Sequence, residues 1–208
     1  MLSVLKMEIL DLGKTDYQRV LNLQRKLFEE KIKNPETEDT VIITEHFPVY
    51  TKGQTTDKSH LPIDIKDIPV LEIERGGSIT FHGEGQIVVY PIISLNRNRK
   101  LSVKNYIFTL EEIMINTLYE FGIRGFREEK RRGVFTEKGK IGFVGVKISR
   151  YVTMHGFSLN VNVDKKYFER IIPCGIKDIP VCNMNDFLPF IEVEHVKPVL
   201  IDWIRRML

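Results

Sequence analysis

Apolar and polar residues recur along this chain with two different periods, which predict where helices and strands form. In residues 15–33 the apolar side chains return every three or four positions, the spacing of an amphipathic helix. A second helix is predicted from Ser102, a good N-cap residue, to about residue 121, where Gly122 ends it. The same period predicts a last amphipathic helix over residues 196–208.

Short apolar runs bounded by glycine, proline or charged residues predict strands. These runs are residues 40–45, 70–74, 86–95 and 151–163, with a hairpin formed by 133–136 and 141–149. Strands outnumber helices and do not alternate regularly with them. The expected fold class is therefore α+β, a mixed or antiparallel sheet flanked by helices. A length of 208 residues suits a single domain, residues 1–208.

Composition narrows the class of protein. The chain is 42% hydrophobic and 28% charged, which is typical of a soluble globular protein, and no apolar run approaches the roughly 20 residues of a membrane span. A net charge of +3 is too small to indicate nucleic-acid binding. The N-terminus lacks a signal-peptide layout, so we expect a cytoplasmic protein without membrane or nucleic-acid partners. Two basic clusters, Arg97–Lys100 and Arg127–Arg132, are either solvated faces or docking sites for an acidic partner.

A glycine-rich segment runs from Arg75 to Gln86 between two predicted strands. Its glycines let the backbone approach a ligand closely and adopt positive φ. The segment matches neither a dinucleotide-binding GxGxxG turn nor a phosphate-binding loop, because no Gly-Lys-Ser/Thr follows it. It is either a glycine-rich hairpin or part of a site, and Arg75 and His82 beside the glycines favour a site.

Two lysines, Lys140 and Lys147, flank a second glycine-containing run. A single lysine is usually solvated, so either one could have no role beyond the surface. Strand alternation predicts that Lys140 and Lys147 point to opposite faces. It also predicts that Lys140 shares its face of the strand with Gly142, Val144 and Val146.

Cys174 stands between Pro173 and Gly175, a setting that predicts a constrained turn. A glycine after the cysteine can leave its N–H free to face an oxyanion. The alternative is an inert buried cysteine, which is the interpretation we give Cys182. The two cysteines are not spaced as a zinc site, and a disulfide is not expected in the cytosol.

Several of these segments together resemble one known family, the lipoyl(octanoyl) transferases. The resemblance covers most of the chain, and its motifs occur in the family's order. They are Glu45–Gly53, Arg75–Gln86 with Tyr90-Pro91 beyond it, Lys140-Ile141 with Gly145-Val146, His155-Gly156 with Leu159–Asn162, and Pro173-Cys174-Gly175. The sequence departs from the family at Glu84, where proline is usual, and at Ser158, where alanine is usual.

The resemblance implies a fold similar to the catalytic domains of biotin and lipoate ligases. It implies that Cys174 carries the acyl group as a thioester and that Lys140 lowers the pKa of that thiol. It also implies an acyl and pantetheine site formed by Arg75, Gly76, Gly77, Ser78, Ile79, Thr80, Phe81, His82, Phe143, Val144, Gly145, His155, Gly156, Phe157 and Ser158. Backbone N–H groups of Gly175 and of the Gly76-Gly77 pair are the expected oxyanion donors.

The implied reaction moves an octanoyl group from octanoyl-acyl carrier protein to a lysine of a lipoyl domain, the first step of protein lipoylation. The acceptors would be lipoyl domains of 2-oxoacid dehydrogenases or the glycine cleavage H protein, and no metal, nucleotide or redox cofactor is required. Two alternatives remain open from the residues alone. One is an ATP-dependent lipoate or biotin ligase, which would not need Cys174, and the other is a non-catalytic protein that binds acyl carrier protein.

Overall fold

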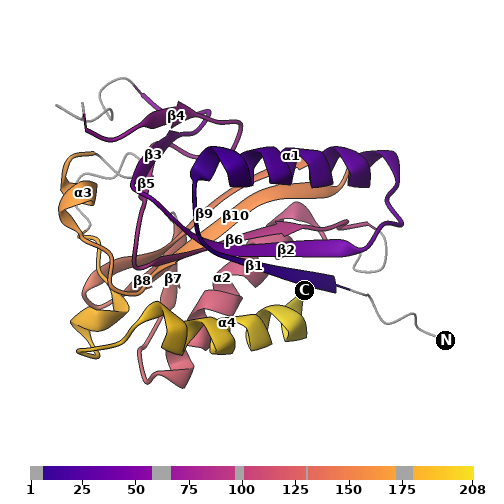
Figure 1. Cartoon of the computed structure of the whole chain (residues 1–208). Coiled ribbons are helices and arrows are strands. Elements are labelled where there is room, and N and C mark those ends of the chain that lie inside the picture. Colours follow the sequence, from indigo (N-terminus) through magenta and orange to yellow (C-terminus); the bar gives the residue numbers. More distant parts are fainter. Residues whose placement is uncertain (1–6, 58–66, 97–100, 130, 172–179) are drawn as a thin grey trace.

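The computed structural model describes residues 7–57, 67–96, 101–129, 131–171 and 180–208, which form two sheets and the helices around them (Figure 1). The elements in chain order are β1 (Met7–Thr15), α1 (Tyr17–Lys33), β2 (Asp39–His46), β3 (Val49–Lys52), β4 (Val70–Glu72), β5 (Thr80–His82), β6 (Gln86–Ile92), α2 (Val103–Glu120), β7 (Phe126–Glu128), β8 (Arg131–Thr136), β9 (Gly139–Ser149), β10 (Val152–Asn160), α3 (Lys166–Glu169), the 3₁₀ turn η3 (Met184–Asp186) and α4 (Val193–Met207).

The larger sheet has seven strands in the order β1-β2-β6-β10-β9-β8-β7. Strands β1 and β2 run parallel, and every other neighbouring pair in this sheet is antiparallel. The smaller sheet has the order β4-β3-β5. A mixed sheet flanked by helices is the α+β architecture that the sequence predicts, and that prediction is confirmed.

Helices cover both faces of the larger sheet, α1 on one side and α2 with α4 on the other (Figure 1). Because side chains alternate along each strand, successive residues pack into the cores on opposite faces of the sheet. On β2, Val41 and Ile43 pack in the core beneath α2 and α4, whereas Ile42 packs in the core beneath α1. On β6, Val89 faces the first of these cores and Val88 the second.

The predicted helices form, and their caps explain where they start. Ser102 Oγ accepts a hydrogen bond from the Asn105 N–H at 3.1 Å, and Gly122 adopts φ +69° just beyond the end of α2. Helix α4 begins at Val193, earlier than predicted. Glu192 and His195 form a capping box there, and it satisfies backbone groups that the apolar period does not report.

Four strands, β1, β3, β5 and β7, do not follow from the sequence patterns. Strand β1 is an edge strand with a register shift against β2, and the other three have only three or four residues each. Short strands of this kind form because partners elsewhere in the chain pair with them. The small sheet joins the large one through a third core, in which Phe81, Phe143 and Phe168 pack together.

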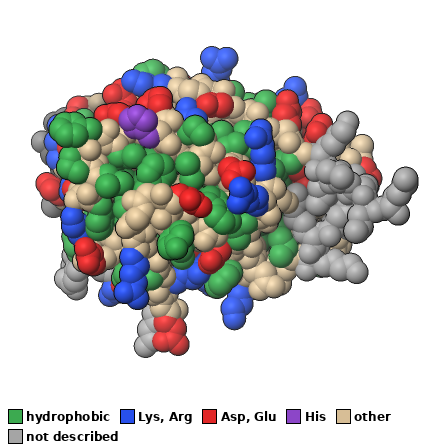
Figure 2. All heavy atoms as spheres, turned by 90° about the horizontal axis from the view of Figure 1, so that it is seen from below, with side chains coloured by type: hydrophobic (Ala, Val, Ile, Leu, Met, Phe, Trp, Pro, Cys, Tyr) green, Lys and Arg blue, Asp and Glu red, His purple; other side chains and the backbone are tan. Residues whose placement is uncertain are grey.

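Seen from the side of α2 and α4, the surface carries patches of apolar side chains between charged ones (Figure 2). Among the described residues, no helix is long and apolar enough to cross a membrane. The opposite side of the sheet, beneath α1, is where the chemistry-bearing side chains gather.

Candidate active site

A small cavity lies between the start of α1, the glycine-rich segment and strands β6, β9 and β10. Its volume is about 40 Å³, and it shares Gly77, Val144 and Gly145 with a wider groove of about 550 Å³. The cavity is lined by Tyr17, Arg75, Gly77, Thr80, His82, Val88, Tyr90, Phe143, Val144, Gly145, His155, Gly156, Phe157 and Ser158. The groove is lined by Thr55, Gly76, Gly77, Ser78, Ile107, Arg131, Arg132, Lys140, Val144, Gly145 and Val146.

Arg75 holds the glycine-rich segment in place. Its Nη2 donates to the carbonyl oxygen and to Oγ1 of Thr51, at 2.6 and 2.9 Å, and its Nη1 donates to the Gly76 carbonyl at 2.9 Å. The segment lies directly against β9, because a Cβ on Gly145 would come within 3.1 Å of the Gly76 carbonyl oxygen. The guanidinium therefore has a structural role in shaping the cavity wall, whatever it does toward a ligand.

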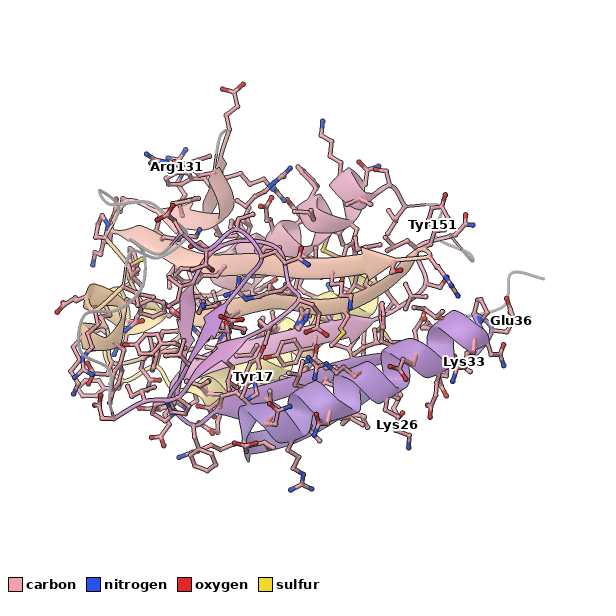
Figure 3. The ribbon with its side chains drawn as sticks, turned by 90° about the horizontal axis from the view of Figure 1, so that it is seen from above. Tyr17, Lys26, Lys33, Glu36, Arg131 and Tyr151 are labelled. Atoms are coloured by element: carbon pink, nitrogen blue, oxygen red, sulfur yellow. The ribbon has the colours of Figure 1, made fainter. Side chains whose placement is uncertain are left out.

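Tyr17, the first residue of α1, forms another part of this wall. Figure 3 shows its side chain on the sheet-facing side of the helix, whereas Lys26 projects from the outer side. The Tyr17 ring stacks on the ring of His82 with centroids 5.8 Å apart and packs against His46 at 4.9 Å. Helix α1 thus contributes an aromatic surface to the site through its first turn.

Three buried histidines surround the cavity or support its walls. Burial lowers the pKa of His46 to about 4 and those of His82 and His155 to about 3, because a charged imidazole loses its hydration there. All three are neutral near pH 7. The Nδ1–H of His46 donates to the Thr15 carbonyl at 2.9 Å, and its Nε2 accepts from the Tyr90 hydroxyl at 2.8 Å.

The cavity also contains polar atoms that have no hydrogen-bond partner within the described part of the chain. They include both ring nitrogens of His155, Oγ1 of Thr80 and Oγ of Ser158. His155 adopts φ +59°, an uncommon conformation for a residue with a side chain and one that costs free energy. A strained residue with two unpaired nitrogens in a cavity is typical of a ligand-binding position.

Lys140 lies in the groove, and only 5% of the residue is exposed. Its Nζ donates to the Arg132 carbonyl at 2.7 Å and lies 5.0 Å from the centre of the Phe143 ring. The predicted face-sharing of Lys140 with Gly142 is wrong. The pairing of β8 with β9 shifts register between these two residues, so strict alternation does not hold, and Gly142 backs onto Met114 of α2 instead.

Lys147 lies beside helix α1. Its Nζ lies 3.8 Å from Oε1 of Glu74 and 5.3 Å from the centre of the Phe28 ring of α1. The two lysines of this strand therefore occupy different surroundings, and of the two only Lys140 lines the groove.

The proposed nucleophile, Cys174, lies outside the described residues, together with Pro173 and Gly175. The chain is described again from residue 180. There the Lys140 N–H donates to the Pro180 carbonyl at 2.8 Å, and the Cys182 N–H donates to the Lys140 carbonyl at 2.9 Å. Both the N–H and the carbonyl of Lys140 are thus hydrogen-bonded to the segment that follows Cys174 in the sequence.

Cys182 is a buried structural cysteine, as the sequence suggests. Burial raises the pKa of its thiol to about 11, and Sγ lies within 3.3 Å of the Gly139 carbonyl. A thiol of this kind carries little thiolate near neutral pH and is a poor nucleophile.

Most of the predicted lining residues meet at the cavity or the groove, but two do not. Ile79 and Phe81 are buried in the third core instead, Phe81 on β5 of the small sheet and Ile79 just before it. The expectation for the Gly76-Gly77 pair also changes, since the Gly76 N–H already donates to the Val146 carbonyl at 3.0 Å. Of these two donors only Gly77 remains a candidate for an oxyanion.

Sequence patterns miss several lining residues. Tyr17 and Val88 fit the apolar faces of the predicted helix and strand, so nothing in the sequence separates them from core residues. Arg131 and Arg132 belong to a basic cluster, but their position beside Lys140 depends on the β8–β9 hairpin. No group of three or more His, Cys, Asp or Glu within the described ranges could hold a metal ion.

Comparison with known proteins gives consistent matches. Residues 16–205 match the model of the lipoyl protein ligase A/B catalytic domain. The chain is 56% identical over 195 residues to an octanoyltransferase of Persephonella marina, with 94% of each chain covered. It is 43% identical over 176 residues to an octanoyltransferase of Nostoc punctiforme, covering 84% of this chain and 76% of the relative.

Solved structures share the fold at much lower identity. LipL1 of P. falciparum in complex with lipoate superposes with a TM-score of 0.75 at 17% identity, covering 97% of this chain and 62% of that chain. Biotin protein ligase from Aquifex aeolicus, with biotin and ATP, gives a TM-score of 0.53 at 13% identity, covering 97% of this chain and 69% of that chain. Both likenesses concern the fold, which is the one that the sequence predicts.

Proposed function

Because the chain belongs to the octanoyltransferase family, within the lipoyl protein ligase A/B catalytic domain, we propose that it transfers an octanoyl group from octanoyl-acyl carrier protein to a lysine of a lipoyl domain. The single observation in the structure that supports this most is the position of Lys140. It is a buried lysine that lines the groove adjoining the cavity, and its backbone is hydrogen-bonded to the segment that follows Cys174 in the sequence.

Cys174 is the proposed nucleophile. Its thiolate attacks the carbonyl carbon of the octanoyl thioester, a new C–S bond forms to Cys174, and the old C–S bond to the carrier breaks. The carrier sulfur leaves as a thiolate and takes a proton. An ordinary thiol with a pKa near 8.5 carries little thiolate at neutral pH, so the positive charge of Lys140 beside it favours the reactive form.

The second step delivers the acyl group. The amine of the acceptor lysine attacks the Cys174 thioester, a C–N bond forms, and the C–S bond breaks. The nitrogen gives up a proton, and the thiolate is regenerated for another cycle. A thioester is the starting point in both steps, so no nucleotide has to activate the acid.

The cavity is the proposed place for the acyl chain. Its volume of about 40 Å³ has room for only a few water molecules, far less than an eight-carbon chain needs. The side chains that line it must therefore move apart when the chain enters. Each methylene adds only about 0.8 kcal/mol on burial, so how far the cavity can open, rather than affinity, should set the chain length.

Intact mass spectrometry tests the proposal against its two rivals. Incubation of the full chain with octanoyl-acyl carrier protein should add one octanoyl group to the wild type and to Cys182→Ala, but not to Cys174→Ala. Addition of a lipoyl domain, from a 2-oxoacid dehydrogenase or the glycine cleavage H protein, should then move the group to the domain without ATP or Mg²⁺.

Each rival predicts a different result. An ATP-dependent ligase would need ATP and Mg²⁺ and would use free octanoate better than the carrier-bound form. A non-catalytic binding protein would hold the carrier and gain no mass. Labelling that depends on Cys182 would contradict the assigned nucleophile.

A further inference from the structure

A row of hydrogen-bonded groups connects the cavity to Lys140 through the interior of the larger sheet. At its centre Gln86 and Asn160 face each other on β6 and β10, with Gln86 Nε2 donating to Asn160 Oδ1 at 2.8 Å. Both side chains are fully buried. In order from the cavity, the members of the row are Arg75, Thr51, His82, Gln86, Asn160, Cys182 and Lys140.

The donor and acceptor in each hydrogen bond of the row can be assigned by starting from the Lys140 end. The Cys182 carbonyl can only accept, so the atom of Asn160 that lies 3.2 Å from it must be the donor Nδ2. The other end of this amide is then Oδ1, and it requires a donor from Gln86. The Oε1 of Gln86 therefore faces His82 Nδ1, 2.7 Å away, and this ring nitrogen must carry a proton.

The Arg75 end leads to the same answer independently. An arginine side chain only donates, and Arg75 donates to Thr51 Oγ1 from Nε and Nη2 at 3.3 and 2.9 Å. These two bonds occupy the lone pairs of the Thr51 oxygen, so its single proton points at His82 Nε2, 3.4 Å away. Nε2 must then be the acceptor. Because burial lowers the pKa of His82 to about 3, the ring carries one proton near pH 7 and not two.

We propose that Gln86 and Asn160 are positioning residues, which hold His82 as the Nδ1–H tautomer and join the cavity wall to the backbone of Lys140. The role in the reaction rests on the octanoyl transfer proposed above, whereas the tautomer does not. Neither side chain lines the cavity or the groove, so both act through other residues.

Two consequences follow for the reaction. His82 lines the cavity and has an unprotonated Nε2, and the weak contact of this nitrogen to Thr51 leaves it able to accept a hydrogen bond from the incoming amine of the acceptor lysine. Lys140 is held at a set distance from the acyl site, because its carbonyl is the last acceptor in the row. A displacement of about 1 Å at such a site can cost about 100-fold in rate.

Nitrogen-15 NMR of the full-length protein tests the tautomer directly. Long-range proton–nitrogen correlations distinguish a protonated ring nitrogen from an unprotonated one, and His82→Gln identifies the signal by its loss. We expect Nδ1 of His82 to be protonated and Nε2 to be unprotonated at pH 7. In Gln86→Met, which keeps the chain length but removes the acceptor, Nε2–H should become populated. Gln86→Glu retains an acceptor and should keep Nδ1 protonated.

Steady-state kinetics test the positioning role. Gln86→Met and Asn160→Leu should lower kcat by about 100-fold, with little change in KM for octanoyl-acyl carrier protein. The matched control is Asn183→Leu, which removes a buried amide that donates to the Val163 carbonyl at 2.8 Å and lies outside the row. Its melting temperature should fall by a similar amount, while kcat and the His82 tautomer stay as in the wild type.

Different results would contradict the tautomer, the positioning role and the proposed function. An Nε2–H tautomer in the wild type, or an unchanged Nδ1–H signal in Gln86→Met, would overturn the tautomer assignment. A loss of kcat in Asn183→Leu equal to that in Asn160→Leu would reduce the role to general stability and overturn the positioning. If the wild type showed the expected tautomer and no octanoyl transfer, the proposed function would fail while the hydrogen-bonded row would stand.

Discussion

The two faces of the larger sheet are built from the same strands, but one forms an apolar core and the other forms a cavity with buried polar side chains. Beneath α2 and α4 the buried residues form one apolar core, to which β6 contributes Ile87 and Val89. Beneath α1 the neighbouring residues Val88 and Tyr90 line a cavity. That side also holds the buried polar side chains of the site: Gln24, His46, Arg75, Thr80, His82, His155 and Ser158.

The difference shows how stability and chemistry are divided in this fold. An apolar face gains free energy for every methylene that it buries, whereas a face with unpaired polar atoms loses free energy that other contacts must supply. The face beneath α2 and α4 therefore stabilises the sheet on which the site is built. Changes on this apolar face should affect unfolding, and changes on the site face should affect transfer.

The largest effect should come from Lys140→Met, which removes the charge that we propose acts on the Cys174 thiol. We expect octanoyl transfer to fall by about 10²–10⁴-fold and the iodoacetamide reactivity of Cys174 to move to higher pH. Lys147→Met is the control, since that lysine lies beside Glu74 and outside the groove. A shift of the thiol titration in Lys147→Met but not in Lys140→Met would reverse the assignment.

The role of the apolar face beneath α2 and α4 is tested by Leu200→Ala. Leu200 lies in the apolar core beneath α4 and is fully buried. Its truncation should lower the free energy of unfolding by about 2–5 kcal/mol, measured by urea denaturation. The kcat for octanoyl transfer, measured well below the melting temperature, should stay within about two-fold, because core residues far from the reacting atoms act through stability. A loss comparable to that of Lys140→Met would contradict the division between the faces.

Acid should destabilise the site face through its histidines. A pKa lowered from 6.5 to about 3 means that folded His155 binds fewer protons than the unfolded chain, so its stabilisation is present above pH 6.5 and is lost as pH falls. Between pH 6.5 and 5 the loss is about 2 kcal/mol for each such histidine. Denaturation of His155→Gln at pH 7 and pH 5 should show a drop smaller than that of the wild type by this amount.

The smallest effect should come from Ser158→Ala, which removes a buried hydroxyl that has no partner among the described residues. Without this unpaired group the free energy of unfolding should rise by about 1 kcal/mol, and the melting temperature should rise by about 2–4 °C. KM for octanoyl-acyl carrier protein should fall slightly as the cavity becomes more apolar. A marked loss of stability would indicate that the hydroxyl has a partner, such as a bound water.

The sequence by itself determined the class of the fold, the main helices and strands, and the segments that carry the site. Residues 15–33 predict α1 because amphipathic spacing directly reports which side is buried. Ser102 and Gly122 predict the ends of α2 because capping and positive φ are local properties of the chain. The glycine-rich segment is predicted for the same reason, whereas the His155-Gly156 pair follows from the resemblance to the transferase family.

Only the tertiary structure decided which residues meet. The register shift in β9 separates Lys140 from Gly142, with which it would share a face by alternation. Ile79 and Phe81 pack in the third core rather than in the cavity. Tyr17 enters the cavity because α1 docks with its first turn against the glycine-rich segment. The direction of the hydrogen-bonded row from Arg75 to Lys140 depends on residues far apart in the chain, so no local pattern could encode it.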